Sequence, residues 1–120
     1  MASVFRGEIR WAVLDPTLGN EQQGTRPALI ISQDVFNERS GTVLAMAITS
    51  KPQRAGLPLT LPLGKVGGKE AWLKISQARV LSKQRLARKL GKATPDQLAQ
   101  AIDGLNEIVG DSGQPCAVTE

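Results

Sequence analysis

Apolar and polar positions follow a strand-like pattern over the first two thirds of the chain and a helical pattern near its end. Strand-like segments are residues 8–14, 29–31, 42–48, 57–62 and 70–81. Pro27 suits the start of the second segment, because a missing N–H at the first residue of a strand costs the fewest hydrogen bonds to the neighbouring strand. Pro58 and Pro62 make the fourth segment an edge strand, and the fifth is long enough to be bent or bulged midway. The pattern therefore predicts a sheet built before the last helix.

Helical signals are shorter and fewer. Residues 34–39 predict one helical turn. Ser82 can cap a short basic helix that runs to about Leu90 and ends at Gly91. The run Thr94-Pro95-Asp96-Gln97 has the residues of a capping box with proline at the first helical position, and apolar residues recur at helical spacing up to Gly110. These elements predict a mainly β fold with α additions: a small, SH3-like, strongly curved β-barrel with a short basic helix and a C-terminal helix.

Length and apolar content set the domain organisation. A chain of 120 residues with 41% apolar residues fits one domain, which we place at residues 1–110, followed by a flexible tail at 111–120. The apolar runs are too short and interrupted for a membrane span, and the first residues lack the apolar core of a signal peptide. We therefore expect a cytoplasmic protein that does not contact a membrane.

The residue types present narrow the chemistry. The chain has no histidine and a single cysteine, Cys116, so it lacks the commonest general base, an internal disulfide and a cysteine cluster for zinc. We expect no metal and no cofactor. Any reaction has to use carboxylates, hydroxyls, amides and basic groups.

Positive charge is concentrated in one stretch. The net charge is +4, and residues 74–92 hold seven basic residues and no acid. Such a segment attracts phosphate backbones, anionic membranes or acidic protein tails, although a solvated helix face explains it equally well. With two tryptophans, two phenylalanines and no tyrosine, an aromatic stacking platform for RNA is poorly supported.

Three stretches carry a family resemblance. They are the run from Asp15 to Pro27 (DPTLGNEQQGTRP), residues 47–51 (AITSK) at the end of the third strand, and residues 76–79 (SQAR) ahead of the basic segment. In order and spacing the chain resembles the MazF/PemK-type toxins from about Gly7 to Gly110. The resemblance implies a sequence-specific, metal-independent endoribonuclease of a type II toxin–antitoxin module. It also implies a homodimer that cleaves single-stranded RNA, and an acidic, partly disordered antitoxin as its inhibitor.

The chemistry of such a cleavage can be matched to residues. Attack of a 2′-hydroxyl on the adjacent phosphorus needs stabilised charge on the phosphate and two proton transfers, and it leaves a 2′,3′-cyclic phosphate and a 5′-hydroxyl. The guanidinium of Arg26 suits the phosphate, and the resemblance pairs it with Thr49. Arginine is a poor base, so Glu21 is assigned to the catalytic set, either in proton transfer or in orienting Arg26 or the loop. Asp15, which precedes a proline, fits a turn better than catalysis.

Other polar residues are predicted to position the RNA. The set comprises Thr17, Leu18, Asn20, Gln22 and Gln23 in the loop, with Ser50, Lys51 and Gln77 flanking the cleavage site. Many family members have lysine where this chain has Leu18, so one cation is missing from the loop. The basic helix predicted after Ser82 binds the RNA backbone or lies on another face.

Two other function classes fit the same fold. Toxins of this barrel type also include DNA gyrase poisons that act by protein–protein contact, here through residues 105–110 of the C-terminal helix. A non-catalytic nucleic-acid-binding module is the other alternative. Loss of cleavage on replacing Arg26 separates the enzyme from both alternatives.

Overall fold

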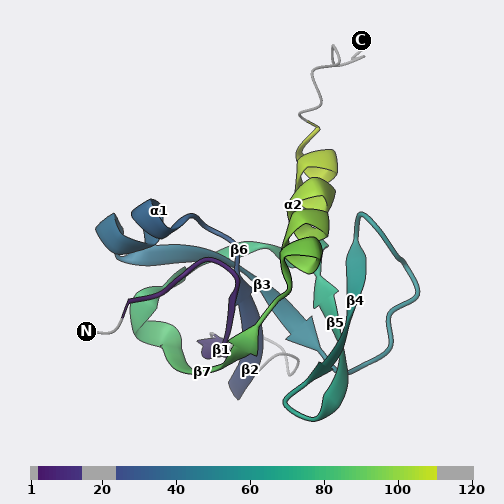
Figure 1. Ribbon diagram of the computed structural model, residues 1–120, viewed down its shortest axis with the longest axis horizontal. Coiled ribbons are helices and arrows are strands. Elements are labelled where there is room, and N and C mark those ends of the chain that lie inside the picture. Colours follow the sequence, from purple (N-terminus) through teal and green to yellow (C-terminus); the bar gives the residue numbers. More distant parts are fainter. Residues whose placement is uncertain (1–2, 15–23, 111–120) are drawn as a thin grey trace.

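A curled antiparallel sheet carries two helices in the computed structural model, which describes residues 3–14 and 24–110 (Figure 1). The strands are β1 (Glu8–Leu14), β2 (Gly24–Ile30), β3 (Thr42–Thr49), β4 (Thr60–Val66), β5 (Lys69–Lys74), β6 (Arg79–Ser82) and β7 (Leu86–Lys92). The helices are α1 (Asp34–Arg39) and α2 (Pro95–Val109), with 3₁₀ turns η1 (Ile75–Gln77) and η2 (Lys83–Arg85). The strand order is β4-β5-β3-β2-β1-β7, with β6 also paired to β3. The predicted α+β class and curved antiparallel sheet are confirmed.

Most of the predicted strands lie where the pattern placed them, but β2 begins at Gly24, so Pro27 lies inside that strand and not at its start. Residues 8–14 are β1, and the 70–81 segment is bent as expected. Its two halves, β5 and β6, both pair with β3, and η1 interrupts them. The predicted edge strand is real but shifted, because β4 begins at Thr60. The tight turn after it lies at Gly67-Gly68, whose φ angles of 61° and 86° favour glycine.

The short basic helix predicted after Ser82 is wrong. Ser82 does cap a turn, accepting the Gln84 N–H at 3.2 Å, but that turn is the 3₁₀ segment η2. The chain then continues as β7, and Gly91 lies inside that strand. β7 pairs along β1 and satisfies backbone groups that would otherwise lie at an open edge. Tertiary pairing therefore outweighs the local helical signal, and the basic segment is largely strand.

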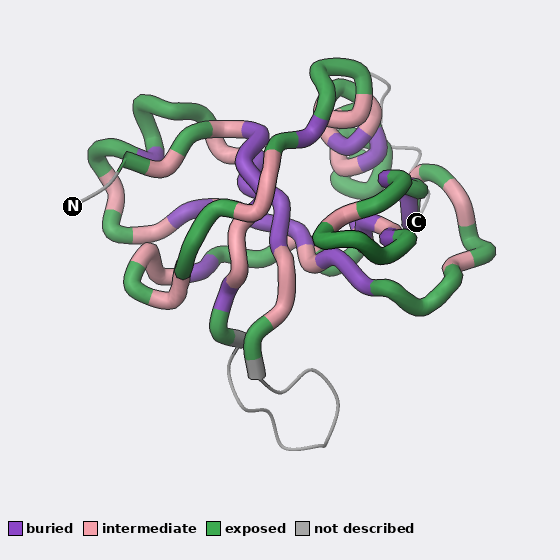
Figure 2. The backbone as a smooth tube through the Cα atoms, turned by 60° about the horizontal axis from the view of Figure 1, so that its bottom comes forward, coloured by how far each residue is buried: buried purple, intermediate pink, exposed green. Residues whose placement is uncertain are grey.

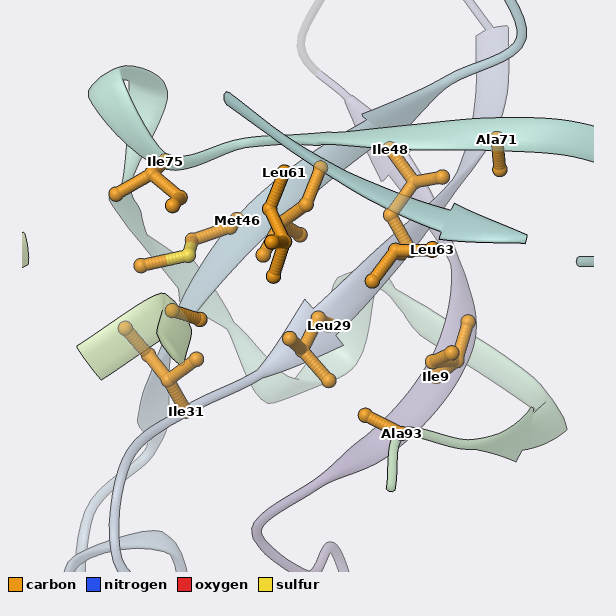
Figure 3. Packing of buried hydrophobic residues seen from close by; sticks show 12 residues of the cluster. Ile9, Leu29, Ile31, Met46, Ile48, Leu61, Leu63, Ala71, Ile75 and Ala93 are labelled. Atoms are coloured by element: carbon orange, nitrogen blue, oxygen red, sulfur yellow. The ribbon is translucent and has the colours of Figure 1, made fainter. Parts of the chain in front are cut away.

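Apolar residues on both faces of the central strands form two core clusters. The larger cluster includes Leu29, Met46, Ile48 and Leu73 and extends to Ala101 of α2, and Figure 3 shows its side chains converging. The smaller cluster, on the opposite face, is Ala12, Ala28, Ile30, Val43, Ala45 and Leu81. Buried stretches accordingly gather in the middle strands, and the turn of the β4–β5 hairpin, residues 67–70, is exposed (Figure 2). Burial on both faces explains why the β2 and β3 sequences read as continuous apolar runs.

The C-terminal helix α2 has the caps that the sequence predicts. Thr94 Oγ1 accepts the Gln97 N–H and Gln97 Oε1 accepts the Thr94 N–H, each at 3.0 Å, and Gly110 closes the helix in the left-handed conformation. Gly104 lets α2 approach closely, since an added Cβ would lie 3.0 Å from Ile75 Cδ1 and 3.1 Å from Pro58 O. No helix in the described part of the chain is long and apolar enough to cross a membrane.

Candidate active site

β2 and β3 separate at one end of the sheet, and the separation creates the site. The Ile31 N–H donates to Leu44 O at 2.9 Å. Backbone groups alternate in direction along a strand, so the backbone nitrogens of Leu29 and Pro27 also point toward β3. Pro27 has no N–H to donate, and the paired register ends just before it, at Ala28–Ala47. Beyond that point β3 keeps its pairing with β5 through Ile48 and Thr49. The two strands diverge where the proline interrupts the ladder.

A cavity of about 260 Å³ lies between the diverging strands and the β4–β5 hairpin. Residues 25–27 of β2 and 48–50 of β3 line one side, and the hairpin contributes Val66, Gly67 and residues 69–71. Trp11 of β1 and Leu90 of β7 complete the lining. The cavity thus has a polar part around Arg26 and an apolar part around Trp11.

Arg26 is the cation of this cavity that comes from the centre of the sheet. Its register partner in β1 is Ala12, a fully buried small residue that leaves room beside the arginine. Its Nε is buried and, within residues 3–14 and 24–110, has no hydrogen-bond partner. A buried, unpaired donor is costly unless an acceptor satisfies it, so this guanidinium is able to bind an acceptor in the cavity.

Thr49 lines the same cavity as Arg26. Continuing the Ala28–Ala47 pairing to the divergent ends sets Thr49 across from Arg26, on the same face of the two strands. Thr49 is only 7% exposed, yet it lines the cavity. Its Oγ1 accepts the Lys51 N–H at 3.2 Å, which orients the hydroxyl oxygen and leaves its proton available to donate. Arg26 and Thr49 can therefore present donors to one anionic group.

The other predicted site residues divide into three groups. Ser50 lines the cavity with Arg26 and Thr49. Lys51, on the exposed loop that follows, and Gln77, in η1, are not among the lining residues. Residues predicted in the loop lie outside the described residues: Thr17, Leu18, Asn20, Glu21, Gln22 and Gln23. The strand ends that flank this loop, Leu14 and Gly24, are register partners, and Gly24 is two residues from Arg26 in β2.

Two charged residues and a tryptophan are among the lining residues that were not predicted from the sequence. Lys69 and Glu70 belong to the β4–β5 hairpin, and Trp11 comes from β1. They are far apart in the chain, and nothing in their local sequence brings them to the motif. Over the described residues, no three His, Cys, Asp or Glu side chains gather as a metal site requires.

A second cavity, of about 350 Å³, lies beside α1 and is lined by Asp34, Asn37, Glu38, Lys83 and residues 3–5. Asn37 is 1% exposed; its Nδ2 donates to Ser32 O at 3.0 Å and to Val4 O at 3.3 Å, and its Oδ1 accepts the Ser32 hydroxyl. Lys83 Nζ donates to Asn37 O at 2.6 Å. The polar groups of Asn37 and Lys83 in this cavity therefore form hydrogen bonds within the protein.

The family of the chain follows from comparison with known proteins. The model of the PemK-like, MazF-like toxins of type II toxin–antitoxin systems matches residues 5–109. The chain therefore belongs to the PemK-like, MazF-like toxin family. A curated relative, Endoribonuclease EndoA of Bacillus subtilis (strain 168), is 38% identical over 108 residues, which cover 88% of this chain and 92% of EndoA.

Solved structures agree with this assignment. MazF from Deinococcus radiodurans superposes with a TM-score of 0.76 at 28% identity, covering 92% of this chain and 99% of that one. A chain of the MazE–MazF complex from the same organism gives a TM-score of 0.76 at 29% identity, covering 93% and 100%. The curled sheet with a short helix and a C-terminal helix is thus the MazF-like fold.

Proposed function

We propose that this protein is the toxin of a type II toxin–antitoxin system and a sequence-specific, metal-independent endoribonuclease. The observation that carries the proposal is the cavity that both Arg26 and Thr49 line, with Arg26 Nε buried and without a hydrogen-bond partner among residues 3–14 and 24–110. Similarity to EndoA along 88% of the chain supports the same reaction class. The substrate is single-stranded mRNA, so the protein acts in the cytoplasm.

The reaction is cleavage through the RNA's own 2′-hydroxyl. The 2′-oxygen attacks the neighbouring phosphorus, the bond from phosphorus to the 5′-oxygen breaks, and the products end in a 2′,3′-cyclic phosphate and a 5′-hydroxyl. The 2′-hydroxyl loses a proton and the departing 5′-oxygen gains one. Arg26 binds the non-bridging oxygens and Thr49 donates to the same phosphate, so both stabilise charge that develops in the transition state. Glu21 removes the proton or orients Arg26.

RNA reaches this site along the loop and the adjoining strand ends. Ser50 lines the same cavity as Arg26 and Thr49, which supports a place for it beside the cleaved bond. Lys51, Gln77 and the loop residues Thr17, Leu18, Asn20, Gln22 and Gln23 contact nucleotides on either side of the cleaved bond. These contacts supply affinity and base preference rather than chemistry.

The protein acts as a homodimer and is inhibited by an acidic, partly disordered antitoxin. Val35 and Phe36 on α1 and Val80 on β6 are large apolar side chains exposed by 61%, 46% and 59%, which suits burial against a second copy. The similarity to a MazF chain from a MazE–MazF complex supports an antitoxin partner. The basic surface favours a partner of opposite charge.

The test is incubation of the purified protein with a long single-stranded RNA in EDTA, beside Arg26→Ala, with mapping of fragment ends. Discrete cuts with cyclic-phosphate and 5′-hydroxyl ends, lost in the variant, support the proposal. Intact RNA at high protein concentration contradicts it and favours a gyrase poison or a non-catalytic binding module. Cuts that persist at full rate in Arg26→Ala remove Arg26 from the mechanism.

A further inference from the structure

The apolar part of the Arg26 cavity has no role in phosphate chemistry. Its wall consists of Trp11, Pro27, Ile48, Val66 and Leu90. Trp11 and Pro27 are register partners in β1 and β2, so the indole lies directly next to the strand that carries Arg26. A phosphate would gain nothing from these side chains, whereas the flat, weakly hydrated face of a nucleobase would.

Glu70 sits in the same cavity lining with the opposite charge from Arg26. Among the described residues that line it, Glu70 is the one carboxylate, and it follows the Gly67-Gly68 turn of the β4–β5 hairpin. A carboxylate here weakens phosphate binding, so its presence needs another explanation. Ionised carboxylates only accept hydrogen bonds, and exocyclic amino groups of bases donate them.

We propose that this cavity is a nucleobase pocket for one nucleotide next to the cleaved bond, with Trp11 stacking on the base and Glu70 accepting from its amino group. The inference rests on the proposed ribonuclease function. The pocket selects adenine, cytosine or guanine. Uracil is rejected because its pairing edge places two carbonyl oxygens around a single N–H, and these oxygens repel the carboxylate.

Base selection is tested by replacing Glu70 with glutamine, which keeps the shape and adds an N–H₂ donor. A degenerate RNA pool is cleaved by the wild type and by Glu70→Gln, and the bases around each cut are counted by sequencing. We expect one position near the cut where the wild type uses uracil about tenfold less than other bases, and where Glu70→Gln removes that bias. Glu107→Gln, an exposed carboxamide change on α2, is the matched control and should keep the wild-type profile.

Stacking is tested separately with tryptophan fluorescence. The chain has two tryptophans, so Trp72→Phe leaves Trp11 as the only reporter. An oligonucleotide with a 2′-deoxy sugar at the cleaved nucleotide binds without being cut. We expect it to quench Trp11, and we expect the same oligonucleotide without a base at the selected position to bind with little quenching.

The outcomes separate this inference from the proposed function. A wild-type protein that leaves all RNA intact contradicts both. A wild-type protein that cuts RNA, while Glu70→Gln has an identical base profile at every position, overturns the pocket and leaves the ribonuclease standing. Equal quenching by the intact and abasic oligonucleotides overturns the stacking role of Trp11.

Discussion

The Arg26 cavity and the cavity beside α1 differ in how their polar groups are satisfied. Beside α1, the side-chain amide of Asn37 forms hydrogen bonds with Ser32 and Val4, and the backbone carbonyl of Asn37 accepts one from Lys83. Between β2 and β3, the buried Nε of Arg26 has no partner within the described part of the chain, and the Thr49 hydroxyl has a proton to donate. The α1 cavity is the larger of the two, at about 350 Å³ against about 260 Å³.

Size therefore does not distinguish a functional cavity from a structural one here. Polar groups that already bond to each other hold elements together, as Asn37 of α1 bonds to Val4 in the N-terminal segment, to Ser32 after β2 and to Lys83 in η2. Donors left without acceptors lower stability unless a ligand binds them. The contrast predicts that substitutions in the Arg26 cavity change activity, and that substitutions of the hydrogen-bonded residues of the α1 cavity, Asn37 and Lys83, change stability.

The largest effect is expected at Arg26. Arg26→Ala should lower RNA cleavage by about 10²- to 10⁴-fold, because the main stabiliser of transition-state charge is lost. The melting temperature should not fall, since Arg26 Nε makes no hydrogen bond to any described residue. Single-turnover cleavage and thermal unfolding measure the two quantities. An unfolded variant, or one of full activity, would remove the distinction between the cavities.

The converse change is Asn37→Ala. It leaves two carbonyls and the Ser32 hydroxyl without their partner, so we expect a loss of about 2–4 kcal/mol in unfolding free energy. Cleavage by the folded fraction should be unchanged. Denaturant unfolding gives the free energy, and Glu38→Ala, at an exposed neighbouring position, is the control that should stay near the wild type.

A smaller effect on activity is expected at Thr49. Thr49→Val keeps the shape of a β-branched residue but removes the donor, and should slow cleavage by about 10- to 100-fold. Thr49→Ser restores a hydroxyl and should lie within a few-fold of the wild type. Equal rates for valine and serine would mean that Thr49 contributes only packing.

The smallest effect is expected at Lys83. Lys83→Met removes the hydrogen bond to Asn37 O but keeps the apolar stem, so we expect a loss of about 1 kcal/mol and a melting temperature lower by about 4 °C. Lys65→Met removes a cation from the exposed β4–β5 hairpin and should leave the melting temperature unchanged. Equal shifts for both would show that net charge, not the Asn37 contact, is responsible.

Strands and the last helix were accessible from sequence because their signals are local. The period of residues 8–14 and the capping residues Thr94 and Gln97 specify β1 and the start of α2 without reference to the rest of the chain. Residues 86–92 carried a conflicting local signal. Leu86, Leu90 and the basic residues between them suit a basic helix in isolation, but pairing with β1 decided for a strand.

The site divides in the same way. Arg26, Thr49 and Ser50 belong to short contiguous motifs, and the family resemblance of these motifs implied a phosphate site before any geometry was known. Trp11, Lys69 and Glu70 carry no such motif, and they join the cavity because the β4–β5 hairpin curls toward β1 and β7. Lys51 and Gln77, predicted beside the cleavage site, lie outside the cavity wall.

Local order in the chain was enough to specify most of the strands and where α2 begins, and the motifs of the family pointed to the two side chains that we propose bind the phosphate. The hydrogen-bonding groups that cap a helix and the spacing of apolar residues depend on neighbours in the sequence, so the sequence alone reveals them. Tertiary structure decided three other features. They are the strand conformation of the basic segment, the divergence of β3 from β2 past Pro27, and the presence of Trp11 and Glu70 in one cavity. These depend on which strand edges are free to pair and how the sheet curls, and such long-range contacts have no local signature.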